Sequence, residues 1–96
     1  MSQTIDDITI SYTEDGVEKV KELDKQVLSK GAWTTIIYKY QDWDNAKQEH
    51  GPVKYSIRRY QKKNDQYWQK SKFNISSKDQ AQKMINILSS WLDDEA

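Results

Sequence analysis

Residues 31–76 hold three segments with the composition of β-strands, and this stretch limits the possible folds more than any other part of the chain. Residues 32–42 are nearly all β-branched or aromatic, which favours a strand with apolar residues on both faces. Residues 53–61 and 67–75 follow, and the turn-forming pairs Gly51-Pro52 and Asn64-Asp65 separate the three segments. The stretch predicts an antiparallel sheet of neighbouring strands.

Side chains alternate along the second and third segments, so a face of the sheet can be predicted for each residue. The inward face is predicted to hold Val53, Tyr55 and Ile57 from the second segment and Ser71, Phe73 and Ile75 from the third. The outward face is predicted to hold Lys54, Ser56, Arg58 and Tyr60, then Trp68, Lys70, Lys72 and Asn74. Trp33 and Lys39 of the first segment share a parity and extend this outward surface.

The region before the sheet is less regular. Residues 1–16 are acidic and polar, and we expect a flexible acidic arm with local β-pairing before a turn at residues 14–16. Val20, Leu23 and Val27 have helical spacing, so local propensity favours a helix over residues 17–28. A tight turn at residues 29–31 leads directly into the next strand, however, and we favour a strand over residues 21–29.

The last segment is predicted to be a helix. Ser76 and Ser77 each precede a capping-box partner by three residues. Apolar residues then form one helical stripe: Ala81, Met84, Ile85, Leu88, Trp91 and Leu92. This stripe must cover either the inner face of the sheet or a second subunit, and we take Met84, Leu88 and Trp91 as candidate dimer-interface residues. The predicted fold is α+β, with four strands followed by one helix (ββββα) in a single domain over residues 17–96.

Composition excludes several classes of function. The 96 residues include no cysteine and one histidine, which argues against disulfides, thiolate chemistry and histidine-based metal sites. The hydrophobic content of 35% leaves little material for a monomeric core, and this favours a homodimer. No apolar run approaches the length of a membrane span, and the first ten residues lack the regions of a signal peptide. We therefore expect a soluble, cytoplasmic protein, associated with the nucleoid in a bacterium.

The formal net charge of zero conceals an uneven distribution. Residues 1–24 carry a net charge of −5, residues 25–72 carry +7 and residues 73–96 carry −2. Because a field arises from local charge, a basic centre between acidic ends can still attract a polyanion.

The outward residues suggest the function. Cations on paired strands about 5 Å apart can follow phosphates, and exposed Trp or Tyr rings stack on unpaired bases. The candidate nucleic-acid-binding residues are Trp33, Lys39, Lys54, Arg58, Tyr60, Trp68, Lys70 and Lys72. A solvated sheet face is the alternative, but the outward rows between Lys54 and Lys72 contain no acid, which favours binding. This interpretation requires Arg58, Tyr60, Trp68 and Lys70 to emerge on one side of the sheet, clear of the helix.

Other motifs are weaker. His50 stands in a loop without a second histidine, and a surface role is favoured over a metal-binding one. Asp42-Trp43-Asp44 resembles the start of a calcium loop, but the glycine and the terminal Glu are misplaced for an EF-hand. No phosphate-binding loop, nucleophile elbow or catalytic triad is present in the sequence, so we expect neither enzymatic activity nor a cofactor.

The runs PVKYSIRRYQ and KFNISSKDQAQKMINIL, with KELDKQVLSKGAW upstream, resemble the positive cofactor 4-like family of single-stranded DNA-binding proteins. The Whirly and Pur-alpha families share the same plan. The resemblance implies a strongly curved four-stranded antiparallel sheet, one helix, and a symmetric dimer formed by helix and sheet. It implies a phosphate contact for Arg58 and base stacking for Tyr60, with Lys70 and Lys72 in a basic region. It also favours a strand over residues 17–28.

Together these observations predict a homodimeric single-stranded DNA-binding protein with little sequence preference, acting in transcription, replication or repair. RNA is an alternative ligand, because stacking and phosphate contacts do not read the 2′-hydroxyl. A second hypothesis is a protein-interaction module that docks part of the transcription or replication machinery. The acidic arm could also mimic nucleic acid and occupy the basic sheet until a strand displaces it.

Overall fold

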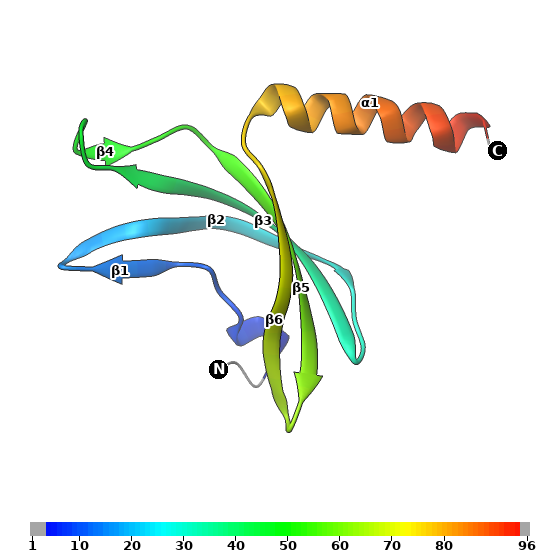
Figure 1. Ribbon diagram of the computed structural model, residues 1–96, viewed down its shortest axis with the longest axis horizontal. Coiled ribbons are helices and arrows are strands. Elements are labelled where there is room, and N and C mark those ends of the chain that lie inside the picture. Colours follow the sequence, from blue (N-terminus) through cyan, green and yellow to red (C-terminus); the bar gives the residue numbers. More distant parts are fainter. Residues whose placement is uncertain (1–3, 95–96) are drawn as a thin grey trace.

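A computed structural model describes residues 4–94 and shows an α+β fold, in which a curled antiparallel sheet is followed by one helix (Figure 1). Across this range the elements are the 3-10 helix η1 (Ile5–Asp7), the strands β1 (Tyr12–Glu14), β2 (Val17–Ser29), β3 (Trp33–Asp44), β4 (Glu49–His50), β5 (Lys54–Lys63) and β6 (Gln66–Ile75), and the helix α1 (Lys78–Asp94). The strand order is β1-β2-β3-β5-β6, and β4 pairs with the end of β3.

The predicted fold class is confirmed in outline, but the expected count of four strands is wrong. β1 folds back on β2 through a turn in which Asp15 and Gly16 have φ angles of 53° and 78°, a left-handed conformation that suits Asp-Gly. β4 arises because the polar loop after Asp44 returns far enough to pair with the extended end of β3. Residues 17–29 form a strand in spite of their helical spacing, since β3 pairs along most of their length.

The N-terminal segment covers one face of the sheet. Ile8 and Ile10 are 3% and 8% exposed, and they pack with Tyr38, Tyr60 and other residues of the main core cluster. The ammonium group of Lys25 donates to three carbonyl oxygens of the segment, those of Ile5 (2.8 Å), Asp6 (3.2 Å) and Ile8 (2.6 Å). Residues 4–14 therefore belong to the packed unit, whereas the sequence pattern predicts a flexible arm there. Residues 1–3 of that arm lie outside the described residues.

Glu22 on β2 binds the next part of the same segment, residues 9–11. Its Oε1 atom accepts from the Thr9 hydroxyl at 2.8 Å and from the backbone N–H of Ile10 at 3.2 Å. The backbone N–H of Glu22 in turn donates to the Ser11 hydroxyl at 3.2 Å. We call this side of the sheet the covered face. Its main residues are Val20, Glu22, Lys25 and Val27 from β2, Thr34, Ile36, Tyr38 and Tyr40 from β3, and Lys54, Ser56, Arg58 and Tyr60 from β5.

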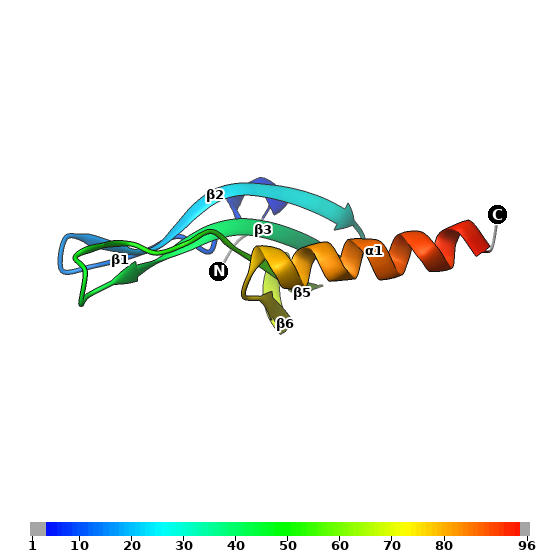
Figure 2. The ribbon, with the colours of Figure 1, turned by 90° about the horizontal axis from the view of Figure 1, so that it is seen from above.

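The opposite side, which we call the open face, is incompletely covered. Along β3 and β5 it consists of Trp33, Thr35, Ile37 and Lys39, then Tyr55, Ile57, Arg59 and Gln61. The helix begins at the end of β6, has its main contacts there, and projects past the strands (Figures 1 and 2). A groove between helix and sheet is lined by Ile37, Tyr55, Ile57, Ile75, Met84 and Leu88, among others. Of the two alternatives for the helix stripe, the structure shows the first in part, since the helix shelters one end of the apolar sheet face.

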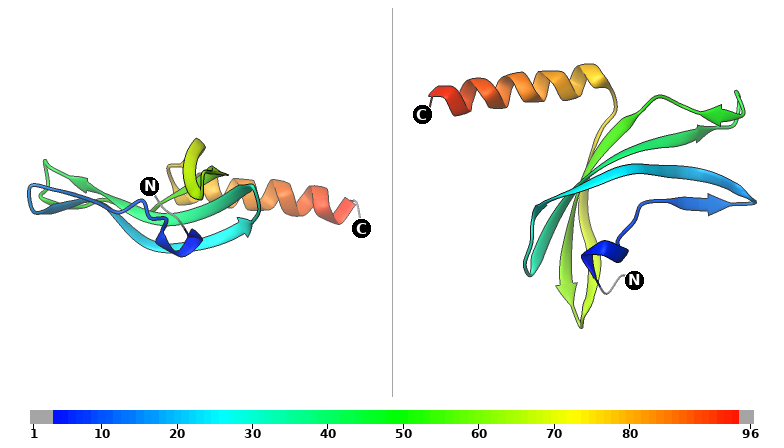
Figure 3. Two further views of the ribbon diagram at one scale, coloured as in Figure 1. Left: turned by 90° about the horizontal axis from the view of Figure 1, so that it is seen from below. Right: turned by 180° about the vertical axis from the view of Figure 1, so that it is seen from behind.

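The molecule is thin and extended. It measures 51 × 39 × 17 Å, and the view from below in Figure 3 shows the helix reaching away from the sheet. The Cα radius of gyration is 15.5 Å. A compact domain of this length would have a radius of about 12.5 Å, so much of the surface that such a domain would bury is exposed here. Among residues 4–94 no helix is long and apolar enough to cross a membrane.

Candidate nucleic-acid interface

The eight predicted binding residues do not share one face. Lys54, Arg58, Tyr60 and Lys72 lie on the covered face, and Trp33, Lys39 and Trp68 lie on the open face. A β-bulge in β6 causes part of this division. Ser71 pairs with Arg59 but Gln69 pairs with Tyr60, so Lys70 is the extra residue and the alternation breaks there. The predicted continuous basic and aromatic surface, with Arg58, Tyr60 and Trp68 on the same side, is therefore wrong, and so is the nucleic-acid interface that was predicted to consist of it.

Arg58 and Tyr60 on the covered face are held by other protein groups. Tyr60 is 5% exposed, and its hydroxyl lies 2.8 Å from that of Tyr38. Arg58 donates to Ser56 at 3.2 Å and to Gln69 at 3.1 Å, and its guanidinium lies 5.9 Å from the centre of the Tyr38 ring. Tyr60 therefore has no free ring face on which a base could stack.

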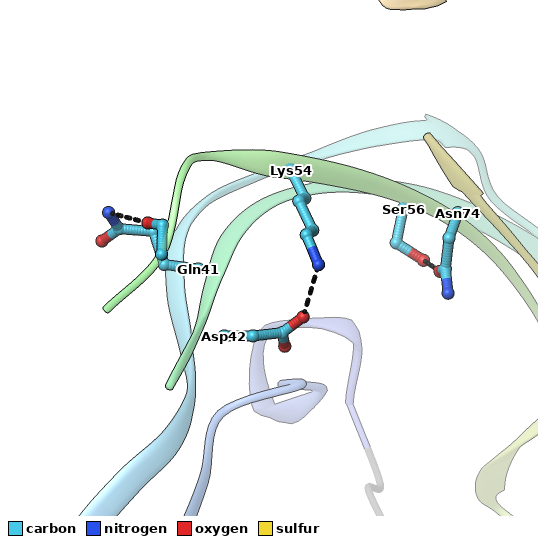
Figure 4. Close-up of polar contacts among 6 residues, drawn as sticks. Gln41, Asp42, Lys54, Ser56 and Asn74 are labelled. Carbon is cyan, nitrogen blue, oxygen red and sulfur yellow. Dashed lines mark hydrogen bonds and ion pairs between the residues drawn. The ribbon is translucent and has the colours of Figure 1, made fainter. Parts of the chain in front are cut away.

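Polar contacts continue along the covered face beyond Arg58. Figure 4 shows the Lys54 ammonium pointing to the Asp42 carboxylate, 3.1 Å away, and the Ser56 hydroxyl donating to Asn74 at 2.7 Å. Asp42 belongs to β3, and the sequence pattern gave no sign that it would oppose Lys54. An acid thus neutralises one of the cations that were predicted to contact phosphate.

Burial also changes the acidity of the tyrosines. Removal from water raises the pKa of Tyr38 far above its ordinary value, and the hydrogen bond with Tyr60 raises it further. Burial likewise raises the pKa of Tyr60, although the Tyr38 hydrogen bond and the Arg58 charge oppose it. These phenols are neutral core groups at physiological pH.

The open face carries a different cluster at the end farther from the helix. Trp33 of β3 pairs with Gln61 of β5, and Gln61 pairs with Trp68 of β6, so the three residues form a row across the sheet. We call Trp33, Gln61 and Trp68 the tryptophan row. The two tryptophans are 41% and 37% exposed. Neighbouring strands lie about 4.8 Å apart, so the two indoles are anchored about 10 Å from each other.

Basic side chains surround the tryptophan row. The Arg59 guanidinium lies 4.5 Å from the centre of the Trp33 ring, close enough for a cation–π interaction. The indole N–H of Trp68 donates to the Lys63 carbonyl oxygen at 3.3 Å, which fixes the ring near the β5–β6 turn. Lys63 and Lys70 line a shallow pocket beside Trp68. The adjoining turn contributes one acid, Asp65.

Arg59 and Gln61 were not predicted as binding residues. They lie on the same side of β5 as Tyr55 and Ile57, and that side was expected to face inward. The adjacent pair Arg58-Arg59 was the available signal, since consecutive strand residues point to opposite faces and a basic residue had to lie on each. Of the predicted residues, the structure brings together Trp33, Trp68 and Lys70. Lys39 lies on the same face nearer the helix, where it lines a second pocket with Ser76 and Lys78.

The remaining candidates have structural roles. The His50 ring meets Trp43 edge-on at 5.1 Å, and its Nε2 atom lies 2.9 Å from the Glu18 carbonyl oxygen. Asp44 accepts from the backbone N–H groups of Ala46 and Lys47 and so stabilises the loop turn. Within residues 4–94 no group of three or more His, Cys, Asp or Glu side chains could hold a metal ion.

The predicted dimer-interface residues occupy the helix stripe. Met84 is half-buried and lines the groove together with Leu88. Trp91 is 63% exposed and Leu92 is 64% exposed on the part of the helix that projects from the sheet.

The fold and the tryptophan row, with the cations around that row, define a small α+β protein with an aromatic and basic patch on an open sheet face. Comparisons of the chain with protein-family models, with curated proteins and with solved structures found no match. The resemblance to the positive cofactor 4-like family therefore stays a prediction from the sequence motifs.

Proposed function

We propose that the protein binds single-stranded nucleic acid through the tryptophan row and the cations around it, and that it acts by binding, without catalysis. One observation carries this proposal: two exposed indoles lie on the same sheet face, one on either side of Gln61, with the Arg59 guanidinium against one of them. Exposed aromatic rings beside unpaired cations are the usual elements of a single-strand binding surface.

The physical chemistry favours unpaired strands. Stacking of a base on an aromatic side chain contributes about 1–3 kcal/mol per base and accepts every base type. A duplex hides its base faces within the helical stack, so it gains little from exposed indoles. Because the two indoles are anchored about 10 Å apart, they would contact different bases of one strand. Arg59, Lys63 and Lys70 would neutralise phosphates and release counterions, which makes binding dependent on salt.

The biological setting follows from the ligand class and from the sequence resemblance. A protein that holds unpaired strands with little sequence preference is useful in transcription, replication or repair, and part of that machinery is a further candidate partner. Single-stranded DNA is the proposed ligand. RNA is the competing ligand, because stacking and phosphate contacts do not distinguish the two sugars.

We further propose that the working form is a homodimer built on α1. The helix exposes Ile85 (55%), Leu88 (51%), Trp91 (63%) and Leu92 (64%), and the adjacent groove is apolar as well. An unpaired apolar stripe of this length marks an interaction surface. In a two-fold arrangement the projecting end of one helix reaches the groove of the other, so one surface serves both subunits. A different protein in this groove would instead make the chain a protein-interaction module.

Fluorescence anisotropy with a labelled dT20 oligonucleotide tests the binding proposal. The wild-type protein should bind dT20, bind a 20-base-pair duplex more weakly, and lose affinity as salt rises. Trp33→Ala with Trp68→Ala should weaken binding at least tenfold, since about 1–3 kcal/mol of stacking is lost at each ring. Lys47→Ala, in the exposed loop before β4, is the surface control and should leave the affinity within twofold. Equal binding of the duplex, or full affinity in the double variant, would contradict the proposal.

A further inference from the structure

Gln61 occupies an unusual position between the two indoles. It is the middle member of the tryptophan row, paired with Trp33 on one side and with Trp68 on the other. The residue is half-buried, its amide is open to solvent, and that amide makes no hydrogen bond to any residue in the part of the chain that the structure describes. Gln41 and Gln69, by contrast, have their amides engaged by Gly51 and Arg58. The row thus contains one amide with unused donors and acceptor between two stacking surfaces.

We propose that Gln61 hydrogen-bonds to the Watson–Crick edge of a base stacked on a neighbouring indole, and that it accepts any of the four bases. This inference rests on the proposed function and identifies the part of the ligand that the site reads. An amide presents an N–H donor next to a carbonyl acceptor. The Watson–Crick edges of all four bases also present an adjacent donor and acceptor, in one order or the other.

The freedom of the amide explains why the site does not select a base. A glutamine whose amide is fixed by the protein presents its donor and acceptor in one order, and so it favours some bases over others. The Gln61 amide has no such partner, so a half-turn about its terminal bond exchanges the two groups and matches either order. In a duplex the Watson–Crick edges are already paired. Gln61 therefore distinguishes unpaired from paired bases, and stacking strengthens that distinction.

Two substitutions separate this role from simple packing. Gln61→Leu keeps a branched side chain that is one atom shorter but removes the donor and acceptor, and it should weaken binding of dT20 and of a (dT-dG)10 oligonucleotide equally, by about fivefold to tenfold. Gln61→Glu leaves acceptors alone. Guanine is the one base with two adjacent donors on this edge, N1–H and N2–H, so a carboxylate pairs best with guanine.

The experiment is therefore the ratio of the two dissociation constants, measured by anisotropy for the wild type and both variants. We expect the ratio of dT20 to (dT-dG)10 to rise at least fivefold in Gln61→Glu relative to the wild type and to stay within twofold in Gln61→Leu. An unchanged ratio in Gln61→Glu, or full affinity in Gln61→Leu, would overturn the inference while leaving the stacking surface intact. Absence of binding by the wild type would instead overturn the proposed function. Circular dichroism of each variant confirms that the sheet is retained.

Discussion

The hydroxyl oxygens of Tyr38 and Tyr60 lie 2.8 Å apart between adjacent strands, on the face that the N-terminal segment covers. Tyr60 alternates with basic residues in the sequence, which is typical of a stacking ring on an exposed strand. Here it is a core residue whose polar end is satisfied by a second buried phenol. The pair shows why the covered face needs Ile8 and Ile10 above it, since the two rings bury their apolar bodies against those side chains.

Alkaline pH should destabilise the fold through these two tyrosines. Burial raises the pKa of both phenols above the unfolded value of about 10. The stabilising contribution is complete below pH 10, and it is lost as the pH rises from there toward the raised values, because the unfolded chain then binds fewer protons than the folded one. Each tyrosine contributes a slope of up to about 1.4 kcal/mol per pH unit.

Urea unfolding at pH 8.5 and at pH 11 measures this effect. The double variant Tyr38→Phe with Tyr60→Phe removes both hydroxyls together, so neither is left without a partner. It should lose less of its unfolding free energy between the two pH values than the wild type does. Lysine titration contributes equally to both proteins and cancels in the comparison. An identical loss in both proteins would show that the phenols are not the cause.

The N-terminal segment should contribute to stability directly. Ile8→Ala with Ile10→Ala empties two core positions, and each such truncation costs about 2–5 kcal/mol. A domain of this size has a total stability of about 5–15 kcal/mol, so the double variant should be largely unfolded at 37 °C. Thr13→Ala, on exposed β1, is the control and should change the unfolding free energy by less than about 0.5 kcal/mol. Wild-type stability in the double variant would show that the segment is a removable arm.

The same segment also bears on the hypothesis that the acidic arm mimics nucleic acid and occupies the basic sheet until a strand displaces it. The face that it covers holds Arg58 and Tyr60, two of the residues first predicted to bind nucleic acid. If displacement of the segment by a strand were part of function, the Ile8→Ala single variant would bind dT20 more tightly. If the tryptophan row is the site, the affinity of that variant should stay within twofold of the wild type, because the row lies on the other face.

Neighbouring arginines offer a matched comparison of the two faces. Arg59 lies against Trp33 on the open face, whereas Arg58 is bonded to Ser56 and Gln69 on the covered face. Arg59→Gln should weaken binding of dT20 and lower the slope of log affinity against log salt by about 0.7 if one phosphate contact is lost. Arg58→Gln should change the salt slope little but lower the unfolding free energy, since it removes a charged donor from a half-buried network. The reverse pattern, with the affinity and the salt slope lowered by Arg58→Gln and not by Arg59→Gln, would indicate that nucleic acid binds to the covered face.

Much of the fold could be predicted from local sequence. The alternation over residues 53–61, the turns at residues 15–16 and 64–65, and the serine residues before α1 each specify local geometry, and the structure contains the strand, the turns and the helix that they predict. Which face of the sheet is buried is not a local property. Alternation separates Tyr55 and Ile57 from Arg58 and Tyr60, but it does not state which set is covered, and the covering residues lie about fifty positions away at Ile8 and Ile10.

The candidate site failed for a related reason. A single extra residue, Lys70, reverses the parity of β6 on one side of the bulge, so Trp68 faces away from Lys72 even though both have even numbers. No residue type marks such a bulge in advance. Trp33 and Trp68 were predicted as binding residues and lie on the open face, where Lys39 shares that face and Lys70 lies beside Trp68. The other predicted residues lie on the covered face: Lys54, Arg58, Tyr60 and Lys72.

The last prediction concerns the projecting helix. If a second copy covers the stripe, Trp91→Asp should place a charge in an apolar interface and shift sedimentation from a dimer to a monomer of 11.4 kDa. Trp91 is 63% exposed on the subunit, so the substitution should not unfold it. Ser90→Asp adds the same charge on the opposite side of the helix and should leave the dimer intact. A wild-type protein that sediments as a monomer at 100 μM would exclude a dimer with a dissociation constant of micromolar or tighter. The apolar groove would then be a binding surface for a different protein.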